Sequence, residues 1–106
     1  MAFRIEIAQP AIDDIDEAVA FIAQDSPSDA AKWKAGLEKL IFSLRDMPTR
    51  YPIIPEAIDL QRSYRSVIHH SHRVVFRIDD EIGVVYVVRV YHGARRPLTE
   101  GDVDPV

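Results

Sequence analysis

The sequence predicts an α+β domain of two layers, in which a short strand is followed by an α-helical hairpin and then by a three-stranded antiparallel meander. Two patterns support this fold. Apolar residues follow a helical period through residues 11–47, and they alternate with polar residues through residues 62–91. The 106 residues suffice for one core and are too few for two. We therefore expect one domain over residues 1–98 and an acidic tail over residues 99–106.

The first strand and the first helix are expected within residues 3–22. Phe3, Ile5 and Ile7 alternate with charged residues, and Pro10 suits the first turn of a helix. Apolar residues then recur at steps of three and four, which predicts an amphipathic helix of about 14 residues. The acidic residues fall on its polar side, near the positive end of the helix dipole. They are Asp13, Asp14, Asp16 and Glu17.

A second helix is expected directly after the first. Ser26, Pro27 and Asp29 form a helix start, with a Ser cap and an acidic residue three positions later. The apolar period continues to Pro48, which predicts a helix of about 20 residues. Because the link is so short, the two helices must form a hairpin. Gly36 is expected to let them approach closely.

Three strands are expected after a loop over residues 49–60. Alternation marks residues 62–68, 73–78 and 84–91, with a turn at residues 79–83. The hairpin must cover one face of this small sheet. We expect that covered face to hold Val74, Phe76 and Ile78 of the middle strand and Tyr86, Val88 and Val90 of the last, with His92 on the same side. The open face then holds Arg73, Arg77, Arg89 and Tyr91, and Arg65 joins them if Tyr64 and Ile68 point inward.

The charges divide unevenly along the chain. The net charge is −4, yet residues 62–98 hold seven arginines, no lysine and only three carboxylates. Guanidinium groups bind carboxylates or phosphates with two hydrogen bonds. The open face is therefore interpreted as a site for an acidic peptide or an RNA backbone. The alternative is an ordinary exposed sheet face on which arginine is simply common.

Composition excludes other classes. With no cysteine there is no disulfide scaffold, thiol nucleophile or cysteine zinc site. No segment is long and apolar enough for a membrane span or a secretory signal, so a cytoplasmic protein is expected. His69, His70 and His72 are a poor metal motif, because adjacent residues of a strand point to opposite faces. No cofactor or metal is predicted.

The order of elements resembles the RelE/ParE superfamily of toxins from type II toxin–antitoxin modules. Three local motifs carry the resemblance, which covers about residues 3–97. They are Ser71–Asp79, similar to a strand of the family; Arg89–Arg96, similar to the C-terminal end of ParE-like members; and Leu44–Pro48, similar to the exit of the helical hairpin.

The resemblance implies a ParE-like toxin, a plasmid stabilisation protein that inhibits growth by binding a cellular target, expected to be DNA gyrase. It also implies neutralisation by a cognate antitoxin, whose acidic and apolar C-terminal segment would bind the arginine-bearing groove. The candidate partner-binding residues are Arg65, Arg73, Arg77, Arg89, Tyr91, Arg95 and Arg96.

Two alternatives remain open. RelE-like members cut mRNA on the ribosome, and a YoeB-like branch uses a Glu, an Arg and a His, which would here be Glu56, Arg73 and His92. Glu56 could accept the ribose proton, His92 could protonate the leaving oxygen and Arg73 could stabilise the phosphorane. The absence of lysine after Lys39 departs from the RelE pattern. The third reading is a non-toxic relative that retains only antitoxin binding.

Overall fold

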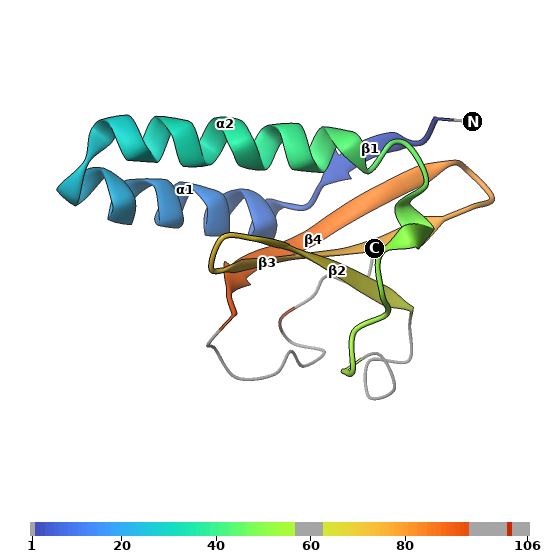
Figure 1. Cartoon of the computed structure of the whole chain (residues 1–106). Coiled ribbons are helices and arrows are strands. Elements are labelled where there is room, and N and C mark those ends of the chain that lie inside the picture. The colour runs from blue at the N-terminus through green and yellow to red at the C-terminus, as the bar shows by residue number, and fades with distance from the viewer. Residues whose placement is uncertain (1, 57–62, 94–101, 103–106) are drawn as a thin grey trace.

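The computed structural model describes residues 2–56, 63–93 and 102 and confirms the predicted α+β order. The strands form one sheet, and the two helices lie side by side on one of its faces (Figure 1). In chain order the elements are β1 (Arg4–Ile7), α1 (Gln9–Asp25), α2 (Pro27–Ser43), a 3₁₀ turn (Pro48–Arg50), β2 (Tyr64–His69), β3 (His72–Asp79) and β4 (Val84–His92).

The sheet has the order β1-β4-β3-β2. Strands β2, β3 and β4 are antiparallel neighbours, which confirms the meander, and β1 runs parallel to β4. Sequence patterns do not indicate the partner of β1. The pairing places the N-terminal strand at one edge and β2 at the other, with the longest strands between them.

The two helices join through Ser26 alone. Its side-chain oxygen accepts a hydrogen bond from the Asp29 backbone N–H at 3.1 Å, which confirms the predicted cap. Each helix has 17 residues. The first is longer than predicted because it continues past Ile22 to Asp25, and the second is shorter because it ends at Ser43, before Pro48.

The main core lies between the hairpin and the sheet, because the helices and strands turn their apolar faces toward each other there. Phe76 and Val74 of β3 lie in it as predicted, and Ile78 packs at its margin. We call this set of buried side chains the helix-facing cluster: Ala11, Ala18, Trp33, Leu37, Ile41, Leu44, Val74, Phe76, Val85, Val87 and Val90.

Gly36 serves a different contact from the one predicted. A Cβ at this position would lie 3.0 Å from Cε1 of His69 on β2, so the glycine admits the His69 ring rather than α1. The ring nitrogen Nε2 of His69 lies 2.9 Å from the backbone carbonyl oxygen of Trp33. The close approach is thus between α2 and the edge strand.

A β-bulge in β4 reverses part of the predicted alternation. Val75 lies opposite Arg89, while the next residue of β3, Phe76, lies opposite Val87, which leaves Val88 as the extra residue. Before the bulge, odd-numbered residues of β4 face the helices, and after it even-numbered ones do.

The prediction that Tyr86 and Val88 face the helices is therefore wrong, whereas Val90 lies where it was predicted. A bulge adds one residue to one strand only, and strict alternation cannot indicate it. The far side of the sheet receives Tyr86 and Val88 instead.

The expected open face is largely closed. Five buried side chains form a second-face cluster on this side: Ile54, Tyr64, Val75, Val88 and Tyr91. The chain after the 3₁₀ turn runs along β2, where the Ile54 N–H donates to the Tyr64 carbonyl at 2.9 Å. Because Val75 and Val88 have no exposed surface, the interpretation of this face as an uncovered arginine groove is wrong.

Candidate functional site

Arg73 and Glu56 form an ion pair at the margin of the second-face cluster. The Arg73 guanidinium donates from Nη2 to Oε2 at 2.5 Å and from Nη1 to Oε1 at 3.3 Å, and it also donates to the Tyr91 hydroxyl. Burial lowers the pKa of Arg73, but the hydrogen bonds with Glu56 and Tyr91 and their charges outweigh it, so the pKa lies above its usual value. The guanidinium is thus satisfied within the chain.

Arg89 is held in the same way by Asp14 of α1. Its Nε and Nη2 donate to the two carboxylate oxygens at 2.7 and 2.9 Å, and Oδ2 also accepts the Val90 backbone N–H at 2.9 Å. Nη1 donates to the carbonyl oxygen of Asp102 at 2.9 Å. Hydrogen bonding to Asp14 is the main cause that raises the pKa of Arg89.

Two predicted positions are thereby corrected. Arg89 does not project from an uncovered surface, and Asp14 is not on the solvent side of its helix, since their side chains are 16% and 10% exposed. Arg89 lies opposite Val75, next to the bulge in β4, and the first half of α1 supplies the carboxylate. The pair fastens the helix to the sheet.

Arg65 lies on the helix side of β2, opposite Phe76, and not with the other arginines. Its Nη1 donates to the carbonyl oxygens of Thr49 and Tyr51, at 3.2 and 2.6 Å. The sequence places Arg65 on the second face only if Tyr64 points toward the helices. Tyr64 instead belongs to the second-face cluster, so Arg65 points the other way. Arg65 instead holds the loop that follows α2.

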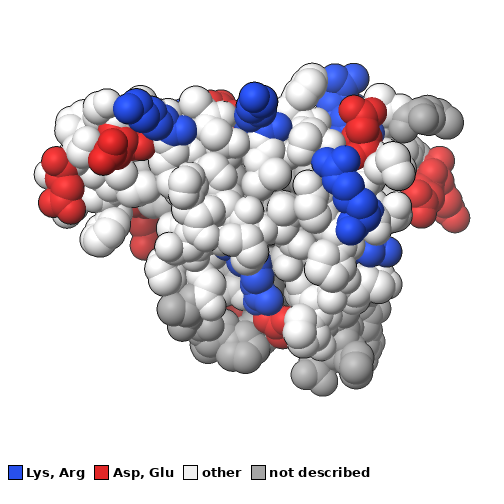
Figure 2. Space-filling model, viewed as in Figure 1, with Lys and Arg blue, Asp and Glu red and all other residues white. Residues whose placement is uncertain are grey.

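Arg77 lies on the second face as predicted, with its guanidinium carbon 4.4 Å from the centroid of the Tyr86 ring. Arg95 and Arg96 lie outside the described residues, as does the predicted tail apart from Asp102. On the face shown in Figure 2, Lys and Arg side chains are spread over the surface rather than gathered in one patch.

The structure brings together only two of the three candidate nuclease residues. Glu56 contacts Arg73 on the second face, but His92 lies on the helix side of the sheet, opposite His72. The ring centroids of His92 and His72 are 5.5 Å apart. The three side chains thus do not share one face of the sheet, since His92 lies on the helix side and Arg73 with Glu56 on the other.

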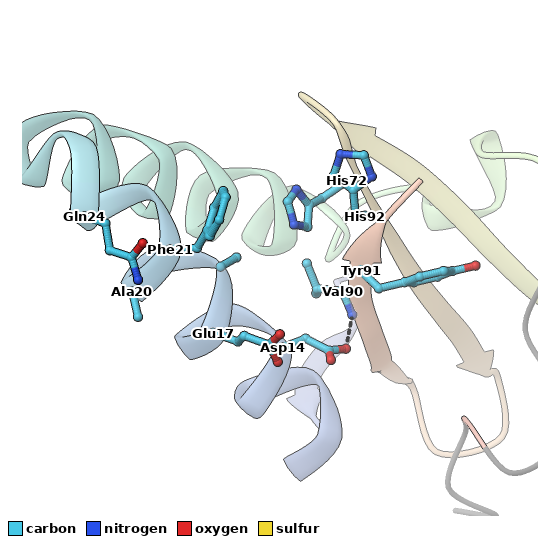
Figure 3. A pocket seen from close by; sticks show the side chains of 10 residues that line it. Asp14, Glu17, Ala20, Phe21, Gln24, His72, Val90, Tyr91 and His92 are labelled. Carbon is cyan, nitrogen blue, oxygen red and sulfur yellow. Dashed lines mark hydrogen bonds between the residues drawn. The ribbon is translucent and has the colours of Figure 1, made fainter. Parts of the chain in front are cut away.

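His72 and His92 line a cleft of about 410 Å³ between α1 and the strands (Figure 3). The wall from α1 includes Asp14, Glu17 and Phe21, spaced by three and four residues so that they share one helix face. This spacing is present in the sequence, but nothing there connects it with two histidines more than 50 residues away. Sequence analysis therefore missed the cleft.

Burial lowers the pKa of His72, and the neighbouring His92 and His69 lower it further, while Asp14 opposes them. The imidazole is therefore neutral at pH 7. Trp33 lies against both His69 and His72, with ring centroids 5.3 and 5.1 Å apart. Trp33 thus packs against the His72 ring that lines the cleft.

The model of one protein family, described as the ParE toxin of the type II toxin–antitoxin system parDE, matches residues 5–97. The chain belongs to this family. The match spans all the described helices and strands except the first residue of β1. A comparison with proteins of curated function gives no significant match.

Two solved structures have the same fold as this ParE family toxin. One is the toxin–antitoxin complex RelBE2 from Mycobacterium tuberculosis, with a TM-score of 0.57 and 23% identity over 87% of this chain and 99% of that chain. The other is the chromosomal ParDE system from P. aeruginosa, with a TM-score of 0.66 and 12% identity over 86% of this chain and 96% of that chain. At these identities the likeness concerns the fold.

Two further observations concern metal binding and membrane insertion. Within residues 2–56, 63–93 and 102, no three His, Asp or Glu side chains come together as metal ligands, despite the four histidines at this corner of the sheet. Neither α1 nor α2 has the length and apolar character that crossing a membrane requires.

Proposed function

We propose that this toxin arrests growth by binding a cellular target, DNA gyrase, and that a cognate antitoxin neutralises it. We favour binding over catalysis because His92 lies on one face of the sheet while Glu56 and Arg73 lie on the other. Membership of the ParE family supports the same choice.

An RNA cleavage site needs a proton acceptor, a proton donor and a cation around one phosphate. In the described part of this toxin the best acceptor, Glu56, is held by Arg73 in a two-bond ion pair, and the guanidinium also holds the Tyr91 hydroxyl. The side chains of Glu56 and Arg73 are mostly buried, 10% and 19% exposed respectively. This arrangement favours a structural role for the pair.

An antitoxin partner is supported by the two structural relatives, which are both described as toxin–antitoxin systems. The surface of this chain supports it as well. Several large apolar side chains on different elements are more than half exposed, and a partner that covered them would gain hydrophobic stabilisation. They are Phe21, Phe42, Met47, Ile68 and Ile82.

The proposal is tested by induced expression in a bacterial host, with growth, mRNA integrity and DNA breaks followed together. We expect growth arrest with gyrase-dependent DNA breaks, intact translating mRNA by primer extension, and recovery when a neighbouring reading frame that encodes the antitoxin is co-expressed. Arrest without DNA breaks would contradict the gyrase target, and arrest that no neighbouring frame relieves would contradict the antitoxin.

The nuclease alternative rests on Glu56, Arg73 and His92, of which Glu56 and Arg73 are in contact. Primer extension separates the two functions. Cleaved mRNA that becomes intact in His92→Ala would establish the nuclease and overturn the binding proposal. Unimpaired growth at full expression would instead indicate a non-toxic relative.

A further inference from the structure

The cleft beside α1 has the form of a binding site. It encloses about 410 Å³, within the range in which proteins hold small ligands. Figure 3 shows α1 on one side and the His72 and His92 side chains on the other, at the ends of β3 and β4. The site is therefore formed jointly by the hairpin and the sheet.

One carboxylate in this cleft is available to a ligand. Asp14 already accepts hydrogen bonds from Arg89 and from the Val90 N–H. Glu17, one helical turn further, is exposed and makes no hydrogen bond or ion pair with any described residue. Since α1 carries five carboxylates and no Lys or Arg, the potential at this wall is negative.

An aromatic ring stands beside this carboxylate. Phe21 lies one turn beyond Glu17 on the same face of α1 and is 70% exposed, although it is among the largest apolar side chains. The face of an exposed phenyl ring attracts cations, and guanidinium stacks on it especially well. A carboxylate and a ring spaced in this way suit a flat cationic group.

The His72 side of the cleft floor does not oppose a cation. His72 is neutral at pH 7 because burial and the adjacent His92 and His69 disfavour its charged form. Arg89, the nearest permanent cation on β4, is neutralised by Asp14. The walls thus offer negative charge and an aromatic face, and the histidine floor adds a polar surface.

We propose that this cleft receives an arginine side chain of a partner protein, with the guanidinium between the Glu17 carboxylate and the Phe21 ring. The proposal rests on the proposed function, in which a protein partner covers the toxin. It assigns a basic contact to this cleft, in contrast to the acidic segment that the sequence analysis expects for the arginine-bearing face. Charge complementarity is the argument for arginine as the occupant.

The test is an NMR titration of the ¹⁵N-labelled full chain with Nα-acetyl-arginine amide, and with the corresponding glutamine and glutamate amides as controls. We expect saturable shifts of the backbone amides of Glu17, Phe21, His72 and His92 with the arginine compound alone. Glu17→Gln and Phe21→Ala should each weaken binding about threefold, the scale of one exposed ion pair or cation–π contact. Asp16→Asn, a matched charge change on α1 outside the cleft lining, should leave it unchanged.

Equal shifts with the arginine and glutamate amides, or arginine binding unaltered in both Glu17→Gln and Phe21→Ala, would overturn the proposal. Because both side chains are exposed, these variants should retain the wild-type spectrum outside the cleft. The titration contains no antitoxin and no gyrase. Its failure would therefore leave the proposed function standing, and failure of the growth assay would leave the cleft chemistry measurable.

Discussion

At the scale of single residues, Asp14 is the main polar link between the hairpin and the sheet. Its carboxylate accepts two hydrogen bonds from the Arg89 guanidinium and one from the Val90 N–H. Removing it would leave a mostly buried cation and a backbone donor without their acceptor. Such losses cost more than the pair itself contributes, because the remaining charge stays desolvated.

We expect Asp14→Ala to lower the free energy of unfolding by about 2–4 kcal/mol, in the range for a hydrogen-bonded ion pair that loses one partner. Urea denaturation at pH 7 measures this. Asp16→Ala is the matched control on an exposed position of α1 and should cost less than about 0.5 kcal/mol. Equal losses in the two variants would contradict the structural role of Asp14.

His72 makes stability depend on pH. Its pKa in the folded protein lies below the value of 6.5 in the unfolded chain, through burial first and then His92 and His69. Below pH 6.5 the unfolded chain therefore binds more protons at this site than the folded one does. The contribution of His72 is complete above pH 6.5 and is lost as the pH falls below it.

Urea denaturation at about pH 7.5 and about pH 5.5 tests this dependence. The wild type should lose stability at the lower pH, and His72→Gln, which cannot titrate there, should lose less. His70→Asn is the control, since His70 is exposed and has a positive φ that asparagine tolerates. If His72→Gln and the wild type lose the same amount, His72 is not the group responsible.

At the scale of elements, the contact between α2 and β2 depends on Gly36. Alanine would favour the helix by about 1 kcal/mol, but its Cβ would lie 3.0 Å from the His69 ring, which is held at the Trp33 carbonyl. We expect Gly36→Ala to be destabilising in thermal unfolding for this reason. Adding His69→Ala should make the Gly36→Ala change stabilising, and a Gly36→Ala single variant more stable than the wild type would contradict the contact.

Sequence patterns predicted α1, α2, the four described strands and the Ser26 cap, because these depend on residues close together in the chain. They could not predict the bulge at Val88, since one extra residue in a strand leaves a run of valines that fits either face equally well. For this reason Tyr86 was predicted on the wrong face of the sheet. The partner of β1 was also not predictable, because strand pairing depends on the whole topology.

At the scale of the whole molecule, two residues that were predicted to bind a partner, Arg73 and Arg89, instead bind carboxylates of other segments of the chain. Arg89 and Asp14 are 75 residues apart in the sequence, and Arg73 and Glu56 are 17 apart. Periodicity assigns a side chain to a face but does not show whether another segment covers that face. The positions of Arg73 and Arg77 on the second face were therefore predictable, and their surroundings were not.

The resulting toxin has one sheet with a core on each face, and most of the arginines described on its strands have contacts within the chain. This arrangement suits a protein that acts by presenting a shaped surface to a partner, rather than one that cleaves a phosphodiester bond. The most direct test is supercoiling of relaxed plasmid DNA by purified gyrase in the presence of the purified toxin. The account predicts lost supercoiling and accumulation of broken DNA. Full supercoiling at a molar excess of toxin would contradict it.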